Sequence, residues 1–466
     1  MALFTVVTIE DMMAVREKRS LTQKELCTKY NCPLVSYTLN IAGPVKRFKN
    51  ADRCFYEGKQ EIEKYLAHSG FTIYEYVLTN EASGLECIWA IAADDVVLKK
   101  AMAHIEEQHP LGRLFDIDVI SEGGEKIMRK SLGLPLRSCL VCGKSGHECA
   151  RSLNHPLEEI LKNTNDIIDN YFFHIDAETI SRCVIRALLY ELSVTPKPGL
   201  VDRHNNGAHK DMDFFSFIDS TVTLIPYFHD MALAGMKNRR VPLGNLLAQL
   251  RRRGLQAENE MLEATGGINT HKGIIFSLGI ICVSCGYIDL PPALPGGKAD
   301  VLMKDIFETA SAIALPALET DFKGITEENA RTNGEMAFAK HNSGGIRAEA
   351  AGGFPSVREH AMPAFEKALK RGYSLEDAGL HALLHLLANV EDTNIISRSS
   401  FNSLFEIQQN LRVFLKNHPD EKAVREYAFE LDKRFCELNI SPGGCADLLV
   451  ITYMMHFIIE RFTARF

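Results

Sequence analysis

The sequence predicts a multidomain protein in which an α+β domain over residues 1–165 precedes a larger all-α domain over residues 166–466. The chain of 466 residues is long enough for two or three domains of about 150 residues each. Residues 1–150 mix the strand-like period of two with the helical period of 3.6, whereas the helical period dominates from about Asp176 onward. The 46% hydrophobic and 24% charged residues are ordinary for globular proteins, which excludes intrinsic disorder, collagen and coiled coil.

Charge, cysteine content and apolar segments predict a cytoplasmic protein without nucleic-acid or membrane partners. The 52 basic and 60 acidic residues give a formal charge of −8, which argues against a protein that coats nucleic acid. The amino terminus has no basic start and reaches Glu10 and Asp11 early, unlike a secretory signal. The most apolar stretch considered, Gly273–Tyr287, is shorter than the roughly 20 residues of a spanning helix. Without an export signal, the 12 cysteines are expected to be reduced thiols or metal ligands.

Two strands, a helix and a third strand are expected along the first domain. Val35–Ile41 and Phe71–Val77 alternate apolar and polar residues, as half-buried strands do. Asp94 and Asp95 precede a run of helical period that ends near residue 110, so an aspartate is expected to cap this helix. Leu111–Ile120 then returns to the character of a strand.

Helices separated by polar, glycine-rich segments are expected in the second domain, and the domain boundary is expected between residues 155 and 175. The expected helices include Ile180–Glu191, Met212–Leu233, Leu243–Leu262, Asp300–Leu318 and Tyr373–Val390. The polar segments are Thr195–Asp213, Gly266–Gly273, His341–Pro355 and Asn439–Asp447. Segments of this kind place backbone N–H groups and polar side chains together, so they are the expected location of the chemistry.

A strand with two aspartates is the first candidate site. On a strand, Asp116 and Asp118 face the same way, while the residues between and beside them face the core. Two carboxylates so placed can hold Mg²⁺ on a triphosphate and neutralise charge at the phosphorus. Arg113, just before them, could bind a phosphate. The alternative is an edge strand with a solvated acidic face.

A cysteine and histidine cluster is the second candidate site. Cys139, Cys142, His147 and Cys149 offer thiolate and imidazole ligands for tetrahedral Zn²⁺, and the C-x2-C start is the usual knuckle. Because the His-x-Cys spacing is unusual, His155 is weighed as a replacement for His147. The alternative is a set of ordinary reduced thiols in a loop. Cys282 and Cys285 lie in an apolar helix, where core packing is expected instead.

The polar segments of the second domain form the third candidate site. Each one alone is explained as a turn or a helix cap, but several in one half of a chain indicate a nucleoside-triphosphate site with a divalent metal. Gly266–Gly273 opens an apolar helix, where backbone amides and Lys272 can bind an anion. His381 and His385 could belong to a metal set, but the sequence favours two histidines packed on a helix.

These residues resemble two known enzyme families. The second domain resembles triphosphoribosyl-dephospho-coenzyme A synthase in the segments TPKPGLVDRHNNGAHKDMD, GGINTHKGIIFSLG, GGIRAEAAGGFP, EDTN and NISPGGCADLL. The first domain resembles the phosphoribosyl-dephospho-coenzyme A transferase that makes holo-citrate lyase, in the segments REKRSLTQ, HPLGRLFDIDV and LGLPLRSCLVC. The resemblance covers nearly the whole chain, which looks like a fused, bifunctional form of the two enzymes. It implies a nucleotidyltransferase-like α+β fold for the first domain.

The resemblance implies a two-step synthesis of the citrate lyase prosthetic group. ATP and 3′-dephospho-coenzyme A would give the triphosphoribosyl intermediate and adenine. The intermediate would then be transferred to a serine of the acyl carrier (gamma) subunit of citrate lyase, with release of pyrophosphate. Mg²⁺ is the cofactor implied, and the malonate decarboxylase carrier is an alternative acceptor.

The matching segments supply the residues that this chemistry requires. The expected catalytic residues are Asp116, Asp118, Asp202, Asp213, Glu349 and Asp392, and the first two are also the expected Mg²⁺ ligands. The expected substrate-binding residues are Arg113, Lys197, Arg203, His209, Asn269, Lys272, Arg347 and Asp447. Two alternatives stay open: the helical half could be a metal-dependent hydrolase of ADP-ribose-type glycosides, and the first half a zinc-knuckle binding module without catalysis.

Overall fold

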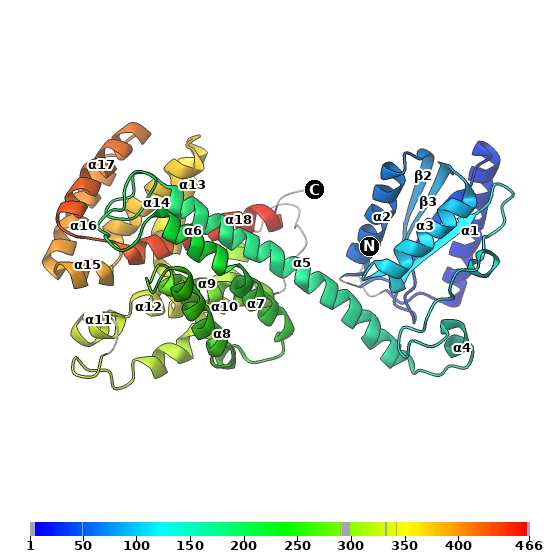
Figure 1. Ribbon diagram of the computed structural model, residues 1–466, viewed down its shortest axis with the longest axis horizontal. Coiled ribbons are helices and arrows are strands. Elements are labelled where there is room, and N and C mark those ends of the chain that lie inside the picture. Colours follow the sequence, from blue (N-terminus) through cyan, green and yellow to red (C-terminus); the bar gives the residue numbers. More distant parts are fainter. Residues whose placement is uncertain are drawn as a thin grey trace. The chain divides into compact units, whose positions relative to one another are not determined.

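The computed structural model describes residues 5–48, 50–288, 290, 299–330, 333–341 and 343–463. The chain divides into two units, Met1–Phe173 and His174–Phe466 (Figure 1). The division falls inside one continuous helix, α5 (Leu157–Ser193), within the interval 155–175 in which the sequence places the boundary and after the division expected between residues 165 and 166. Of the polar segment expected at His341–Pro355, Asn342 lies outside the described residues.

Four strands form one antiparallel sheet in the first unit. They are β1 (Leu34–Leu39), β2 (Thr72–Glu81), β3 (Gly84–Ala92) and β4 (Phe115–Ile120), in the order β2-β3-β1-β4. The first two expected strands are confirmed as β1 and β2. The third, expected from residue 111, begins only at Phe115 because Gly112–Leu114 forms a 3-10 turn. The sequence analysis missed β3, since its burial is almost continuous and its residues do not alternate between apolar and polar.

Helices pack on both faces of this sheet. They are α1 (Ile9–Tyr30), α2 (Ala51–His68) and α3 (Asp95–Gln108). On one face, the ring of Tyr37 stacks on Phe55 of α2, with 4.8 Å between centroids, and Phe115 packs edge-on to Tyr37 at 5.6 Å. On the other face, Leu34 and Ile88 share a cluster with Leu26 of α1. The even-numbered positions of β4 lie on this α1 side, because Ile120 belongs to the same cluster.

Helix ends in the first unit follow the expected capping chemistry. Asp94 is the N-cap of α3, and its carboxylate accepts a hydrogen bond from the N–H of Val97 at 2.9 Å, which confirms the expected cap. Helix α1 was not expected, although Thr8 and Asp11 form a capping box at its start. After β4 the chain forms a 3-10 turn at Arg129–Leu132 and the short helix α4 (Gly146–Arg151).

The second unit is helical throughout its described residues. Besides the end of α5, its helices are α6 (Phe214–Thr223), α7 (Ile225–Lys237), α8 (Leu243–Ala264), α9 (Lys272–Tyr287), α10 (Ala299–Asp321), α11 (Asn333–His341), α12 (Gly345–Ala351), α13 (Met362–Lys370), α14 (Leu375–Asn389), α15 (Thr393–Arg398), α16 (Phe401–Lys416), α17 (Glu421–Glu437) and α18 (Gly443–Thr463), with a π-helical turn at Val357–Ala361. The expected helices are confirmed, except that the run from Met212 to Leu233 is two helices that divide at Leu224, just before Pro226.

The last helix is the most apolar long helix among the described residues. Gly443–Phe462 has a mean hydropathy of 1.3 and is long enough to cross a membrane by length and composition alone, a feature that the sequence analysis overlooked. However, 61% of this stretch is buried inside the protein, which is typical of a core helix. Helix α18 also contacts α14, α10, α9 and α15 in the second unit. It therefore serves as a central helix, with its first turn available to the polar segments around it.

Candidate functional site

Asp116 and Asp118 project from the same face of β4, as the sequence predicts. The residues that alternate with them are buried in the sheet's core. Asp116 Oδ1 lies 3.1 Å from Nη1 of Arg137, and Asp118 Oδ2 lies 2.6 Å from Nζ of Lys126. Both basic residues belong to the segment after β4, so this segment folds back onto the two carboxylates.

Arg137 is the arginine beside Asp116. Its guanidinium donates to Asp116 and to the backbone carbonyls of Arg113 and Phe115. Arg113 donates instead to the carbonyl of Ser138, and its buried Nε has no hydrogen-bond partner among the described residues. Burial, and next the charge of Arg137, lower the pKa of Arg113. The phosphate-binding role of Arg113 stays a prediction, and the sequence analysis did not single out Arg137.

A cavity of about 190 Å³ opens beside Asp116. Its wall includes Thr38 and Asn40 from the end of β1, Arg19 of α1 and Glu86 of β3. Arg19 Nε lies 2.6 Å from Glu86 Oε2. Burial raises the pKa of Glu86, and the charge of Arg19 opposes this change. The cavity therefore joins the REKRSLTQ segment on α1 to the strand with the two aspartates.

Three cysteines and a histidine gather into one cluster after β4. The ligand atoms of Cys139, Cys142, Cys149 and His155 all lie within 4.8 Å of one another. His147 is not in this group, whereas His155, the replacement weighed from the sequence, is. The physical reason is that His147 and Cys149 lie two residues apart on α4, where side chains do not share a face.

The geometry of this cluster would allow it to hold a metal ion. Cys142 Sγ lies 3.5 Å from Cys149 Sγ. The backbone of Lys144 and then the neighbouring His155 imidazole lower the pKa of Cys142 to about 6, which favours the thiolate. His155 Nδ1 lies 3.3 Å from Oε2 of Glu159, and its buried Nε2 has no hydrogen-bond partner in the described part of the chain. A histidine oriented by a carboxylate through one nitrogen, with the other nitrogen available, is typical of a zinc ligand.

The polar segments of the second unit meet one another. His209 Nε2 lies 2.7 Å from the hydroxyl of Ser441, which joins the segment after α5 to the segment before α18. Asp392 Oδ2 accepts a hydrogen bond from the N–H of Cys445 at 2.8 Å, which joins the loop after α14 to the start of α18. Burial is the largest of the effects that lower the pKa of His209. The sequence analysis did not identify Ser441 as a partner of His209.

Asp447 is a carboxylate with no hydrogen bond or ion pair among the described residues. It is partly exposed in the first turns of α18 and lies against Gly273, because a Cβ at position 273 would collide with the carboxylate. Burial, followed by the charges of Glu191 and Asp392, raises its pKa well above the usual range. A carboxylate with a raised pKa and vacant oxygens is suited to accept a proton.

A buried ion pair contributes to the same environment. Lys197 Nζ lies 2.6 Å from Oε1 of Glu191, and neither side chain is more than 5% exposed. Burial raises the pKa of Glu191, and the ammonium of Lys197 opposes this change. Lys197 was expected to hold a triphosphate, but its partner in the structure is Glu191. The sequence offered one signal, since Glu191 lies on the apolar stripe of its helix.

Three predicted catalytic aspartates accept hydrogen bonds from backbone amides. Asp202 is 3% exposed and accepts from three amides of its own loop. Asp213 is exposed at the N-cap of α6, where the amide and hydroxyl of Ser216 lower its pKa. Asp392 is 1% exposed and caps α15. These contacts account for the three residues as local structure, so their catalytic roles stay predictions.

Three more predicted substrate-binding residues, which we call the rim residues, have partners within the protein: Arg203, Asn269 and Lys272. Arg203 forms an ion pair with Glu376, and Lys272 Nζ lies 3.0 Å from Oε2 of Glu258. Asn269 accepts a hydrogen bond from the N–H of Lys272 at the start of α9. The two cations, Arg203 and Lys272, are about half exposed, and exposed ion pairs exchange partners at little cost in free energy.

Glu349 and Arg347 lie on α12. The hydroxyl of Ser356 donates to Glu349 at 2.6 Å, and burial raises the pKa of Glu349. The guanidinium of Arg347 lies 5.6 Å from the centre of the Phe322 ring. Burial is the largest cause of the raised pKa of Cys445, and the charges of Asp392, Glu349 and Asp447 add to it, so Glu349 belongs to the same environment as the two aspartates.

The remaining histidine and cysteine pairs pack in the core. His381 lies 5.3 Å from the ring of Tyr373, and burial lowers the pKa of His385 to about 4. Cys282 and Cys285 are fully buried in α9. The favoured interpretation of packed side chains holds for these cysteines, and neither histidine is part of the metal-type cluster found in the described residues.

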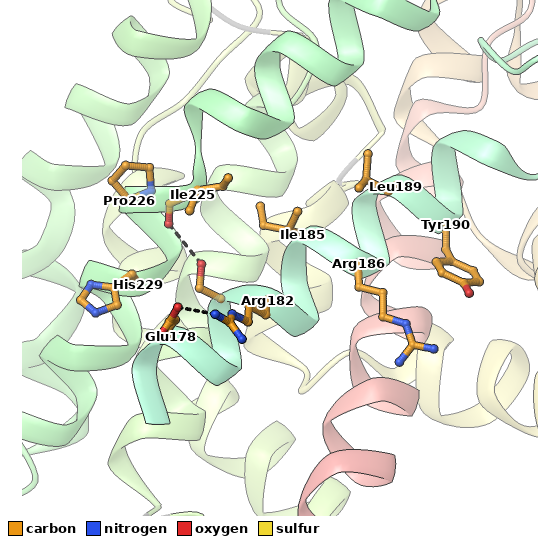
Figure 2. Close-up of a pocket in the computed structure, with 10 residues that line it drawn as sticks. Glu178, Arg182, Ile185, Arg186, Leu189, Tyr190, Ile225, Pro226 and His229 are labelled. Atoms are coloured by element: carbon orange, nitrogen blue, oxygen red, sulfur yellow. Dashed lines mark hydrogen bonds and ion pairs between the residues drawn. The ribbon is translucent and has the colours of Figure 1, made fainter. Parts of the chain in front are cut away.

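An apolar groove of about 590 Å³ lies between α5 and α7 of the second unit. Figure 2 shows Ile185 and Ile225 among the side chains that line it, with Arg182 held by Glu178 at its edge. The hydroxyl of Ser181 donates to the carbonyl of Ile225 across the two helices. The lining residues include none of the residues predicted to be catalytic or substrate-binding.

Comparison with known families accounts for both units. The model for apo-citrate lyase phosphoribosyl-dephospho-CoA transferase (CitX) matches residues 7–171, and the model for ATP:dephospho-CoA triphosphoribosyl transferase (CitG) matches residues 177–466. Protein CitXG of Haemophilus influenzae is 32% identical over 449 residues, which cover 96% of this chain and 95% of the relative. The chain belongs to the CitXG family.

Other relatives agree with this membership. Protein CitXG of Leuconostoc mesenteroides is 30% identical over 453 residues, covering 94% of this chain and 95% of the relative. A probable triphosphoribosyl-dephospho-coenzyme A synthase of Photobacterium profundum is 39% identical over 272 residues, covering 58% of this chain and 84% of the relative. Members of the CitXG family combine two transferases, so this chain is an enzyme with two transferase activities in the synthesis and attachment of the citrate lyase prosthetic group.

Gly273→Ala should abolish most of the synthase activity of this CitXG member while the fold survives. The new Cβ displaces the Asp447 carboxylate, but alanine in a helix is about 1 kcal/mol more favourable than glycine, so the free energy of unfolding should change little. Adenine release from ATP and thermal unfolding measure the two effects.

Gly254→Ala is the matched control, because a Cβ there meets the protein no closer than 3.8 Å within helix α8. This variant should keep full activity. Normal adenine release by Gly273→Ala would contradict a requirement for the Asp447 carboxylate, in its present position, in the synthase reaction.

Proposed function

We propose that this chain makes the triphosphoribosyl prosthetic group in its second unit and attaches it to the citrate lyase acyl carrier in its first unit. The observation that carries the proposal is the convergence, within each unit, of the family segments around carboxylates: Asp116 in the first unit, and Asp392 with Asp447 in the second. In the first step, ATP and 3′-dephospho-coenzyme A give the intermediate and adenine. In the second, the carrier serine displaces pyrophosphate.

Asp447 is proposed as the general base of the first step. The 2′-hydroxyl oxygen of dephospho-coenzyme A attacks the anomeric carbon of the ATP ribose, the bond to adenine breaks, and adenine leaves with the electron pair and takes up a proton. Asp447 receives the hydroxyl proton, for which its vacant oxygens and raised pKa are suited. The nearby carboxylate of Asp392 adds negative potential that stabilises positive charge developing on the ribose.

Mg²⁺ is proposed to bring the triphosphate to this acidic environment. Lys197 supplies one positive charge against the carboxyls of Glu191, Asp392 and Asp447. A triphosphate would be repelled by such a site, whereas Mg²⁺ can bind one or two carboxylates together with phosphate oxygens and water. The partly exposed cations at the rim, Arg203 and Lys272, are proposed to contact the outer phosphates.

The first unit is proposed to transfer the group as a nucleotidyltransferase. Asp116 and Asp118 would hold Mg²⁺, which would neutralise charge on the triphosphate, and Arg137 and Lys126 keep the two carboxylates in place. The serine oxygen of the carrier attacks the α-phosphorus, its proton passes to water, and pyrophosphate leaves with the electrons of the broken P–O bond.

Zinc is proposed as a structural ion of the first unit. Cys139, Cys142, Cys149 and His155 supply four ligands of the types that tetrahedral Zn²⁺ requires, and Glu159 orients the histidine. The ion would hold the segment after β4, which carries Arg137 onto Asp116. It supplies structure and no reaction step.

One experiment tests the proposal as a whole. The purified chain is incubated with ATP, dephospho-coenzyme A, Mg²⁺ and apo acyl carrier, and the mass of the carrier is measured. The full mass increase of the phosphoribosyl-dephospho-coenzyme A group supports both steps. Adenine release that needs no dephospho-coenzyme A would identify a glycoside hydrolase instead, and an intermediate that never reaches the citrate lyase carrier would refute the second step.

Asp116→Asn and Asp447→Asn should separate the two activities. Asp447→Asn should lower adenine release by about 10²–10⁴-fold, because it removes the proposed base, yet it should modify the carrier normally when the intermediate is supplied. Asp116→Asn should release adenine normally and accumulate the intermediate, with carrier modification lowered about 10²-fold or more. Each variant serves as the control for the other. A stably folded Asp116→Asn protein without adenine release would contradict two separate sites.

The purified chain should contain about one equivalent of zinc. Cys142→Ser and His155→Ala should lose it, because each removes a ligand, whereas His147→Ala should keep it. Elemental analysis and the unfolding temperature measure the result. A metal-free protein with a disulfide between Cys142 and Cys149, or loss of zinc on replacing His147, would overturn this ligand set.

A further inference from the structure

The cavity beside Asp116 has a wall that is unusually rich in charged side chains. Three cations line it: Arg16 and Arg19 from α1, and Lys46 from the loop after β1. The neutral donors Thr38, Asn40, Thr79 and Ser83 also line it. These residues come from segments that are far apart in the sequence, so the fold assembles the site and no single motif contains it.

Each acidic residue of the wall already has a basic partner. Asp52 pairs with Arg47, Glu81 with Lys18, Glu86 with Arg19, and Asp116 with Arg137. The four ion pairs neutralise the four acids and use only one of the three lining cations. Positive charge is therefore left over on the wall.

The two remaining cations have no acidic partner among the described residues. Lys46 Nζ donates to the backbone carbonyl of Ile41, which is neutral. Arg16 forms no hydrogen bond or ion pair within the described ranges. Its charge acts there on Lys46, whose pKa it lowers. Burial, and then the charge of Arg16, lower the pKa of Lys46, so the two cations are close enough to repel each other. An anion bound between them would remove this repulsion.

The size of the cavity limits the anion. A volume of about 190 Å³ is smaller than the roughly 300–1,000 Å³ of sites that enclose a drug-sized ligand. A whole coenzyme A derivative does not fit, whereas two linked phosphates are compact and strongly charged. The described residues of the wall include Asp116, one of the two proposed metal ligands, but not Asp118.

We propose that this cavity binds the β- and γ-phosphates of the triphosphoribosyl intermediate and holds them as pyrophosphate after transfer, with Arg16 and Lys46 as their charge partners. This assignment rests on the transferase function proposed above for the first unit. Breaking the bond between the α-phosphorus and its bridging oxygen leaves negative charge on the pyrophosphate, and the two cations stabilise that charge. Arg113, which the sequence predicts to bind a phosphate, is not among the residues that line this cavity.

Pyrophosphate binding to the full chain tests this directly. The only tryptophan, Trp89, lies on β3 of the first unit, so its fluorescence during heating follows that unit. Millimolar pyrophosphate with Mg²⁺ should raise the unfolding temperature by several degrees in the wild type, because a ligand that binds only the folded state stabilises it. The shift should be lost in Arg16→Ala and partly restored in Arg16→Lys. Lys24→Ala, an exposed change on the same helix, should respond as the wild type does.

Kinetics with the supplied intermediate give the second measurement. Arg16→Ala should raise the KM for the intermediate and weaken inhibition by pyrophosphate, each about tenfold or more, since one charge-assisted contact to phosphate is lost. Adenine release should stay at the wild-type rate. Equal thermal shifts in wild type and Arg16→Ala, or no shift in either, would overturn the cavity assignment. Failure of the transferase proposal is seen separately, as a wild type that never modifies the carrier although pyrophosphate shifts its unfolding.

Discussion

The buried ion pair between Lys197 and Glu191 is the interaction on which the second unit's polar centre depends. Both groups are almost fully withdrawn from water, so removing either one alone leaves an unpaired charge at a cost of about 3–5 kcal/mol. The pair fixes the segment after α5 to the end of that helix. The same segment reaches Ser441 through His209, and so the ion pair determines where the start of α18 and its Asp447 lie.

The first unit is organised by a comparable link, although its partners are exposed in part. Arg137 joins β4 to the cysteine segment, because it donates both to Asp116 and to the backbone of that strand. Arg113 donates back to Ser138, one residue before Cys139. The acidic strand and the cluster are therefore mechanically coupled, which explains why a structural ion there would matter for transfer at Asp116.

Local patterns predicted much of the fold but little of the site's pairing. The alternation in β1 and β2 and the cap at Asp94 are local signals, and the structure confirms them. Strand β3 was not predicted, because both its faces are buried and its residues do not alternate between apolar and polar. The presence of His155 rather than His147 in the cluster depends on the directions in which the side chains of α4 point. The ion pair of Lys197 with Glu191 could not be predicted from composition or spacing, since it depends on how the loop folds back onto α5.

The two units solve the problem of binding phosphate with opposite charge. The second unit gathers carboxyls around the ammonium of Lys197, so in the proposed mechanism a divalent cation would be needed between these carboxyls and a phosphate. The cavity wall in the first unit carries the cations Arg16 and Lys46, so under the proposal above it would bind phosphate directly, and a metal would be needed only where the phosphoryl group is transferred. This difference suits the two proposed reactions, because the first would hold a triphosphate that stays intact, whereas the second would stabilise a pyrophosphate that leaves.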